Sequence, residues 1–281
     1  IIGVVGAISL DIASFMVALV ALVAVRIPMP AKTVDGLAMP ASIWRQAFGG
    51  FRYLGARPAL LGLCGCFSIT SFLVLGVLVL NVPYILDRTG NVALLGVVLG
   101  ALNFGALAGA VTMAVWGGTR PRIHTVMLGV TVVGAFLALA GVSRGALSIG
   151  ASLFALMFAI PFIEAASMSI FQAKTAPDLQ GRVFASISQI TALLRPAAYL
   201  VAGPLADRVF EPARGRPVWR SVAWLVGAGP GAGIGLMFVM AGTLALLLGL
   251  AFYGIPAIRR MESTLPDHGA TMEPTEGKSV A

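Results

Sequence analysis

The feature that most constrains this chain is a series of apolar runs, each long enough to cross a lipid bilayer. A helix needs about 20 largely apolar residues to span the hydrocarbon core. Seven runs of suitable length occur, near residues 1–25, 60–83, 92–116, 123–142, 146–172, 183–206 and 230–256. Turn-forming residues separate several of them, for example at 81–83, 87–91, 117–121 and 176–178. The sequence therefore predicts an all-α polytopic membrane protein with seven transmembrane helices.

Composition supports a membrane setting. Of the 281 residues, 58% are hydrophobic and only 11% are charged, whereas a soluble domain has about 25% charged residues. The 34 glycines suit helices whose backbones approach closely in lipid. Basic loops, which orient membrane proteins, account for the net charge of +8. Composition therefore excludes a soluble enzyme and gives no support to a nucleic-acid partner.

Residues that bind metals or carry out covalent chemistry are sparse. The only two cysteines, Cys64 and Cys66, lie together in one apolar run, which provides neither a disulfide framework nor a metal-binding spacing. Residues 141–145 match the G-x-S-x-G pattern of hydrolases, but they join two apolar runs instead of a strand and a helix. We expect no metal, no cofactor and no enzyme activity.

The spacing of the runs divides the chain into four segments. We predict a transmembrane helix at 1–25, a cytoplasmic linker at 26–59, a six-helix transmembrane domain at 60–257 and a cytoplasmic tail at 258–281. The tail mixes charges with Pro, Gly, Ser and Thr, which is typical of a mobile segment. Because the chain opens directly in apolar sequence, we expect it to begin inside a longer protein.

The linker contains an amphipathic pattern. Four apolar residues recur there at helical spacing: Ile43, Ala47, Phe51 and Leu54. Basic residues fall on the other faces of the same predicted helix. Two interpretations remain open at this stage. The pattern predicts either a basic amphipathic helix lying on the membrane surface or a segment packed against the helix bundle.

The distribution of basic residues predicts the orientation in the membrane. Loops on one side, including the linker and the tail, hold 12 Lys and Arg residues, and loops on the other side hold six. Lys and Arg accumulate on the cytoplasmic side. We therefore predict a multi-pass plasma (inner) membrane protein with a cytoplasmic C-terminus. The long outer loop, 207–229, contains Trp219 and Trp224, which favour the membrane interface.

Charged residues within the apolar runs are the strongest functional signal, because an ionisable group at the bilayer centre costs at least about 2.5 kcal/mol and normally faces a cavity or a partner. Three such residues occur: Asp11, Glu164 and Arg195. At about 1.5 Å per residue, Glu164 lies roughly 15 Å from Lys174 and Arg195 roughly 20 Å from Arg182, so both are near the midplane.

These two residues have a functional and a structural interpretation. In the first, Glu164 binds a proton or a cationic substrate while Arg195 tunes it or binds an anionic group. In the second, they form an ion pair that holds two helices together. Asp11 would lie near the outer edge of the hydrocarbon core, which favours an interfacial residue over a secondary site.

Two further patterns concern helix shape and packing. Pro161 and Pro196 stand close to Glu164 and Arg195, and bent helices at midplane depth are where transporters place binding sites. Two GxxxG patterns, at 96–100 and 105–109, predict close helix packing.

Four motifs resemble those of the major facilitator superfamily, in the branch that includes enterobactin exporters and macrolide efflux proteins. They are Phe51-Arg52-Tyr53-Leu54, Trp116-Gly117-Gly118, Gln180-Gly181-Arg182-Val183-Phe184, and the segment 202–212, Ala-Gly-Pro-Leu-Ala-Asp-Arg-Val-Phe-Glu-Pro. The similarity extends over most of 1–257. It implies that the seven runs correspond to helices 6 to 12 of a twelve-helix transporter, with 26–59 as the central cytoplasmic loop.

The resemblance also implies roles for single residues. Glu164 would lie on a cavity-lining helix 10 and Arg195 on helix 11, at the interface of the two halves. Gly181 and Arg182 match the loop that opens helix 11, where the glycine permits a tight turn. Asp207-Arg208 is similar to the family's gating signature, but it falls at the outer end of its helix, where an interfacial ion pair is the better interpretation.

Two departures from the family pattern limit these expectations. The 117–123 turn carries Arg120 and Arg122 without the usual acidic residue. Helices 1 to 5 have no counterpart in the chain, and alternating access requires two six-helix halves. The chain alone should therefore not transport.

The sequence thus predicts part of a secondary-active transporter that exports small molecules of the drug, macrolide or siderophore type by proton antiport. Its expected partners are a small-molecule substrate, protons, the lipid bilayer and the missing N-terminal transporter half. The alternative is a non-transporting membrane scaffold, or a degenerate facilitator half associated with a biosynthetic enzyme.

Overall fold

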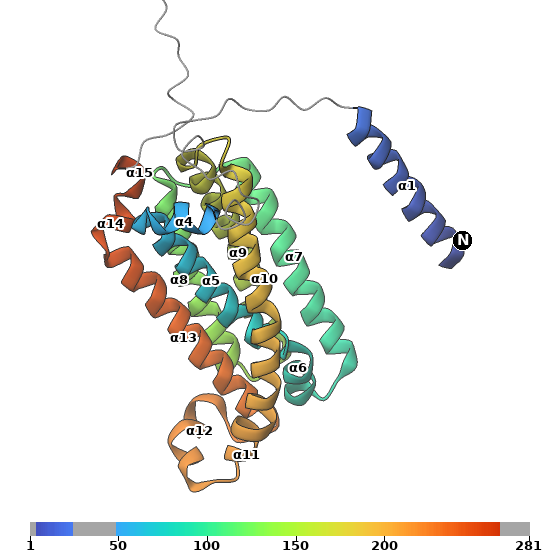
Figure 1. The fold of residues 1–281 in the computed structure, drawn as a ribbon. Coiled ribbons are helices and arrows are strands. Elements are labelled where there is room, and N and C mark those ends of the chain that lie inside the picture. The colour runs from blue at the N-terminus through green and yellow to red at the C-terminus, as the bar shows by residue number, and fades with distance from the viewer. Residues whose placement is uncertain (1–3, 25–48, 265–281) are drawn as a thin grey trace, which may run out of the picture.

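The computed structural model describes residues 4–24 and 49–264, and every regular element in these two ranges is a helix (Figure 1). The long helices are α1 (Val4–Ala24), α5 (Pro58–Leu78), α7 (Val92–Trp116), α8 (Arg122–Val142), α9 (Ala146–Lys174), α10 (Gln180–Leu205) and α13 (Ala232–Gly254). Short elements connect or flank them: α4 (Gly49–Gly55), α6 (Asn81–Thr89), η1 (Ala206–Phe210), α11 (Glu211–Ala213), η2 (Pro217–Trp219), α12 (Arg220–Val226), α14 (Pro256–Arg259) and α15 (Met261–Thr264).

Five of the described helices are long and apolar enough to cross a membrane: α5, α7, α8, α9 and α13. The predicted all-helical, multi-span class is confirmed at this level. The other two predicted spans also form helices, but α1 has a shorter apolar stretch, Ile8–Leu22, and α10 carries Arg182, Arg195 and several Ser, Thr and Gln residues. The count of seven spans therefore stays a prediction.

The bundle is a chain of neighbouring helices with α8 near its middle. Helix α8 packs on α9 and α13, α9 also packs on α7, and α13 and α10 both pack on α5. Helices α9 and α10 are consecutive, yet they make little direct contact. This arrangement leaves one face of α9 and one face of α10 available to line a cavity.

Glycines determine the closest helix contacts. A Cβ atom on Gly134 of α8 would overlap the backbone of Leu246, and one on Gly242 of α13 would overlap the backbone of Ala138. In the second GxxxG pattern, Gly105 and Gly109 lie directly against carbonyl groups of α9. The first pattern behaves differently, because nothing lies within 4 Å of a Cβ placed on Gly96 or Gly100. Close packing by GxxxG is thus confirmed only for 105–109.

The two ends of the bundle carry different elements. We call residues 49–57, 117–122, 174–182 and 255–264 the basic end, and residues 79–91, 143–145 and 206–231 the loop end. Helices α4, α14 and α15 lie together at the basic end, whereas α6, α11 and α12 lie at the opposite end (Figure 1). Eight Lys and Arg residues fall at the basic end and six at the loop end, so the loops counted together for orientation do lie together.

Two sequence predictions change at the ends. The turn predicted at 81–83 is wrong, because Asn81 begins α6 and Pro83 falls in its first turn, where no backbone N–H is needed. Residues 258–264, predicted to belong to the tail, instead lie in α14 and α15, and Ile258 and Met261 are buried against the bundle.

The amphipathic pattern of the linker is described only in part. Its first half, including Ile43 and Ala47, lies outside the described residues. The described part, α4, contacts α5 and α10, and Tyr53 and Leu54 are buried there. The Tyr53 hydroxyl donates to the carbonyl of Lys174 at 3.2 Å. The described part of the linker is therefore packed against the bundle.

Candidate functional site

A cavity of about 410 Å³ lies between α5, α9 and α10. This volume is in the range of small-molecule sites. Aromatic, aliphatic and a few polar side chains line it: Phe67, Glu164, Ser167, Met168, Phe171, Phe184, Ile187, Ser188, Thr191, Ala192 and Arg195. The structure therefore brings Glu164 and Arg195, the two midplane charges, to the same cavity.

Each helix contributes one continuous face to this cavity. On α9 the lining residues are 164, 167, 168 and 171, and on α10 they are 184, 187, 188, 191, 192 and 195. Residues three and four apart share a helix face. Steps of three and four residues along the sequence, starting from Glu164 and from Arg195, lead to most of these lining residues, so this face could have been predicted from the sequence. Phe67 of α5 completes the lining, whereas Met157 of α9 packs against the core.

Glu164 and Arg195 face the cavity without a direct ion pair between them. Both side chains are exposed to this open space, and no oxygen of Glu164 comes within salt-bridge distance of a nitrogen of Arg195 in the described chain. The guanidinium is still close enough to act electrostatically on the carboxylate. An ion pair that locks α9 to α10 is thus absent from this arrangement, and each group is accessible to a ligand.

Two of the lining residues carry a polar group with an unfilled hydrogen-bonding position, Ser167 and Ala192. The Ser167 side chain is 4% exposed, and its hydroxyl has no partner among the described residues. Pro196 has no N–H to donate to the carbonyl of Ala192, a cavity-lining residue one turn earlier. The cavity therefore combines an apolar wall with one carboxylate and one guanidinium.

The remaining predicted site residues lie elsewhere. Asp11 is an exposed residue of α1, and its backbone carbonyl accepts a hydrogen bond from the Ser14 hydroxyl at 2.8 Å. Gly181 and Arg182 open α10 at the basic end. A Cβ on Gly181 would meet no atom within 4 Å, so no close contact requires this glycine. The glycine that is required here is Gly50, whose Cβ would overlap the Arg182 carbonyl.

Asp207 and Arg208 lie on η1 at the loop end, and both are exposed. In the part of the chain that the structure describes, these two residues form no ion pair with each other. The ion pair of this region joins Glu211 and Arg214, with Oε2 and Nε 2.6 Å apart. The expected interfacial ion pair is therefore displaced by four to six residues along the chain.

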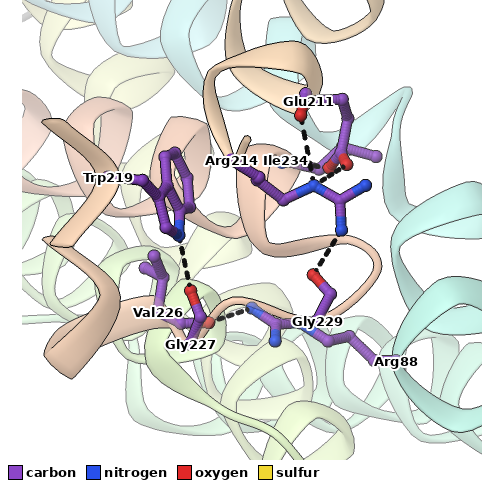
Figure 2. A network of polar contacts seen from close by, with 8 residues as sticks. All are labelled: Arg88, Glu211, Arg214, Trp219, Val226, Gly227, Gly229 and Ile234. Atoms are coloured by element: carbon purple, nitrogen blue, oxygen red, sulfur yellow. Dashed lines mark hydrogen bonds and ion pairs between the residues drawn. The ribbon is translucent and has the colours of Figure 1, made fainter. Parts of the chain in front are cut away.

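Figure 2 shows how this ion pair belongs to a network at the loop end. Glu211 Oε1 accepts the N–H of Ile234 at 3.1 Å, and Arg214 donates to the Gly229 carbonyl at 2.7 Å (Figure 2). Trp219 Nε1 donates to the Gly227 carbonyl at 2.9 Å. Arg88 of α6 donates to the Val226 carbonyl at 2.8 Å. These bonds fix the 206–231 segment against α6 and α13, which is a structural role.

The described residues provide no metal site. Within residues 4–24 and 49–264, no group of three His, Cys, Asp or Glu side chains is placed to hold a metal ion. Cys64 and Cys66 are buried and are not bonded to each other.

The comparisons with known proteins place the chain in no family. No protein-family model, no curated protein and no solved structure matches it.

Proposed function

We propose that this chain is the C-terminal portion of a secondary-active efflux permease that exports a small amphipathic molecule in exchange for protons. The observation that carries the proposal is the cavity between α5, α9 and α10, in which Glu164 and Arg195 face open space from two consecutive helices. Intramembrane ionisable residues that face a cavity are typical of substrate and proton pathways. The resemblance to the major facilitator superfamily supports the same assignment, with the chain corresponding to helices 6 to 12.

The lining of the cavity suggests how the site would act. Phe67, Phe171 and Phe184 provide an apolar and aromatic wall for the body of a substrate. Glu164 would hold either a proton or a cationic group, so that binding of one releases the other. Arg195 would stabilise the carboxylate when it is deprotonated.

Orientation and partners follow from the same proposal. The basic end would face the cytoplasm, because Lys and Arg concentrate there. A second six-helix half would cover the open side of the cavity, and alternating access would occur between the two halves.

The test uses the full-length protein that contains this chain, assayed in inside-out vesicles with an imposed pH gradient. Uptake of ethidium, erythromycin and enterobactin identifies a transported probe. Glu164→Gln should then lower proton-driven uptake at least about tenfold, since the neutral amide cannot exchange a proton. Asp207→Asn removes an exposed carboxylate outside the cavity and should stay within about twofold of wild type.

Two outcomes would contradict the proposal. If the wild-type protein transports none of the three probes, the efflux class is wrong and a non-transporting scaffold becomes the better assignment. If Glu164→Gln transports as well as Asp207→Asn, the proton-coupling role of Glu164 is wrong.

A further inference from the structure

A second cavity, of about 350 Å³, lies between α8 and α13 near the basic end. Seven residues line it: Thr119, His124, Met127, Leu128, Thr131, Leu250 and Tyr253. It shares no residue with the cavity that holds Glu164 and Arg195. The transport site therefore does not account for it.

This cavity changes from polar to apolar with depth. Thr119 and His124 stand at the start of α8 and Tyr253 at the end of α13. Leu128 lies four residues beyond His124, about 6 Å further along α8 at 1.5 Å per residue. The deeper Thr131 hydroxyl already donates to the Met127 carbonyl at 2.9 Å. The polar end of the cavity thus lies at the helix termini, and the apolar end lies further along α8 and α13, toward the middle of their length.

The apolar part opens on the outer surface of the bundle. Leu128 is 62% exposed, Leu250 52% and Tyr253 41%. Both α8 and α13 are candidate membrane spans, so this surface lies where acyl chains would contact the protein. A free inorganic anion would gain nothing from such an apolar floor.

One arginine lies beside the polar part in space, and two more are sequence neighbours of residues that line it. The guanidinium carbon of Arg259 lies 6.0 Å from the centroid of the Tyr253 ring, and Arg120 and Arg122 flank Thr119 and His124 in sequence. In the described residues none of these three arginines forms an ion pair. The nearby Glu262 carboxylate is engaged, since its Oε2 accepts the N–H of Ile123 at 3.1 Å. Three arginines against this one carboxylate leave a net positive charge near the polar part.

His124 adds an unsatisfied polar atom. Its Nδ1 is buried and has no hydrogen-bond partner in the described part of the chain, and its ring centroid lies 5.6 Å from that of Tyr253. Buried polar atoms in folded proteins are nearly always hydrogen-bonded. The ring of His124 therefore lines the polar end of the cavity beside Tyr253, and its Nδ1 lies on the buried side of the ring.

We propose that this cavity binds one anionic phospholipid. Its phosphate would lie near Arg259, Arg120 and His124, and one acyl chain would run along Met127, Leu128 and Leu250. Basic pockets between spanning helices at the cytoplasmic side are suited to anionic headgroups. This inference requires only that the helices span a membrane, and it is independent of transport.

Lipid retention measured by native mass spectrometry tests the proposal directly. The full chain is purified in detergent and incubated with equimolar phosphatidylglycerol and phosphatidylcholine. Wild type should retain one phosphatidylglycerol in clear preference to phosphatidylcholine. The double variant Arg120→Gln/Arg259→Gln should weaken this binding about 25-fold, because each arginine near an anionic headgroup contributes a factor of about five. The matched control, Arg208→Gln/Arg216→Gln, removes two exposed arginines from the loop end and should bind as wild type does.

A second variant and a competitor show whether binding depends on the acyl chain as well as on the phosphate group. Leu128→Trp fills the apolar floor without changing charge, so it should also weaken phosphatidylglycerol binding. Inorganic phosphate at the same concentration should not compete. Equal retention of the two lipids, an equal loss in the loop-end control, or displacement of the lipid by inorganic phosphate would each overturn the proposal. Thermal melting of each sample checks that the variants are folded.

Discussion

Two regions of the bundle use helices of similar length in different ways: the contact between α8 and α13, and the α9–α10 face, by which we mean the cavity-lining sides of α9 and α10. At the α8–α13 contact, Gly134 and Gly242 place backbone against backbone. On the α9–α10 face, Phe171, Phe184 and Arg195 extend large side chains into the cavity. Around Gly134 and Gly242 the two helices touch without a space between them, because these residues have no side chains. The α9–α10 face lines a cavity, because large side chains keep the neighbouring helices apart.

This difference follows from how helices associate in lipid. Without a hydrophobic driving force between spans, close backbone approach and van der Waals contact provide the stability. A helix face of bulky and charged residues loses that contact and gains a lined space. We therefore expect substitutions at the α8–α13 contact to lower stability, and substitutions on the α9–α10 face to change function with little effect on stability.

The largest effect is expected at the glycine contact. Gly242→Leu places a side chain where the Ala138 backbone already lies, and such overpacking costs about 3 kcal/mol or more. The variant should lose its monodisperse peak in size-exclusion chromatography. Gly100→Leu, at a position with no neighbour within 4 Å of a Cβ, should elute as wild type does. Equal behaviour of the two variants would show that α8 and α13 are not in backbone contact.

A medium effect is expected at Tyr84, which fixes α6 to the same closed region. Its ring stacks on Phe238 of α13 with centroids 4.9 Å apart, and its hydroxyl donates to the Ala140 carbonyl of α8 at 2.7 Å. Tyr84→Phe leaves buried carbonyl groups without this donor, at a cost of about 1–2 kcal/mol. Thermal unfolding monitored by intrinsic fluorescence should show a lower midpoint.

The control for Tyr84 comes from the open region. Tyr199 of α10 is 45% exposed, so Tyr199→Phe should change the free energy of unfolding by less than about 0.5 kcal/mol. A larger loss for Tyr199→Phe than for Tyr84→Phe would reverse the assignment of stability to the closed region.

A small effect on stability is expected at Glu164. Because the carboxylate is exposed to the cavity and forms no direct ion pair with Arg195, Glu164→Gln should change the free energy of unfolding by less than about 1 kcal/mol. The same substitution is the one expected to abolish proton-driven transport. A strongly lowered melting temperature would instead favour the structural interpretation, in which the two charges hold the helices together.

The sequence contained much of the framework. The run at 92–116 coincides with α7, whose Asn91 side chain accepts the N–H of Ala93 at 2.8 Å as a helix cap. Length and apolarity define such a helix without reference to its neighbours, which is why these elements could be predicted. Glu164 and Arg195 could also be selected, because a charge in an apolar run is visible in the sequence itself.

Other features depend on contacts between distant residues. Gly134 and Gly242 belong to no GxxxG pattern, and their role follows only from the pairing of α8 with α13. The Ser167 hydroxyl lacks a hydrogen-bond partner because of how α9 packs against its neighbours, which the sequence alone does not reveal. The Glu211–Arg214 pair replaced the expected one at Asp207 and Arg208 because the 206–231 segment folds back on α13. No local pattern encodes these arrangements.

The central claim is that the α9–α10 face lines a water-filled cavity within the membrane. Single cysteines at Thr191, which lines the cavity, and at Leu247, a 54% exposed residue of α13 outside it, test this in the full-length protein with Cys64 and Cys66 replaced by alanine. Only a hydrated cysteine ionises and reacts with a charged methanethiosulfonate reagent. The account predicts that Thr191→Cys reacts at least about tenfold faster than Leu247→Cys. Equal rates, or faster reaction at 247, would contradict it.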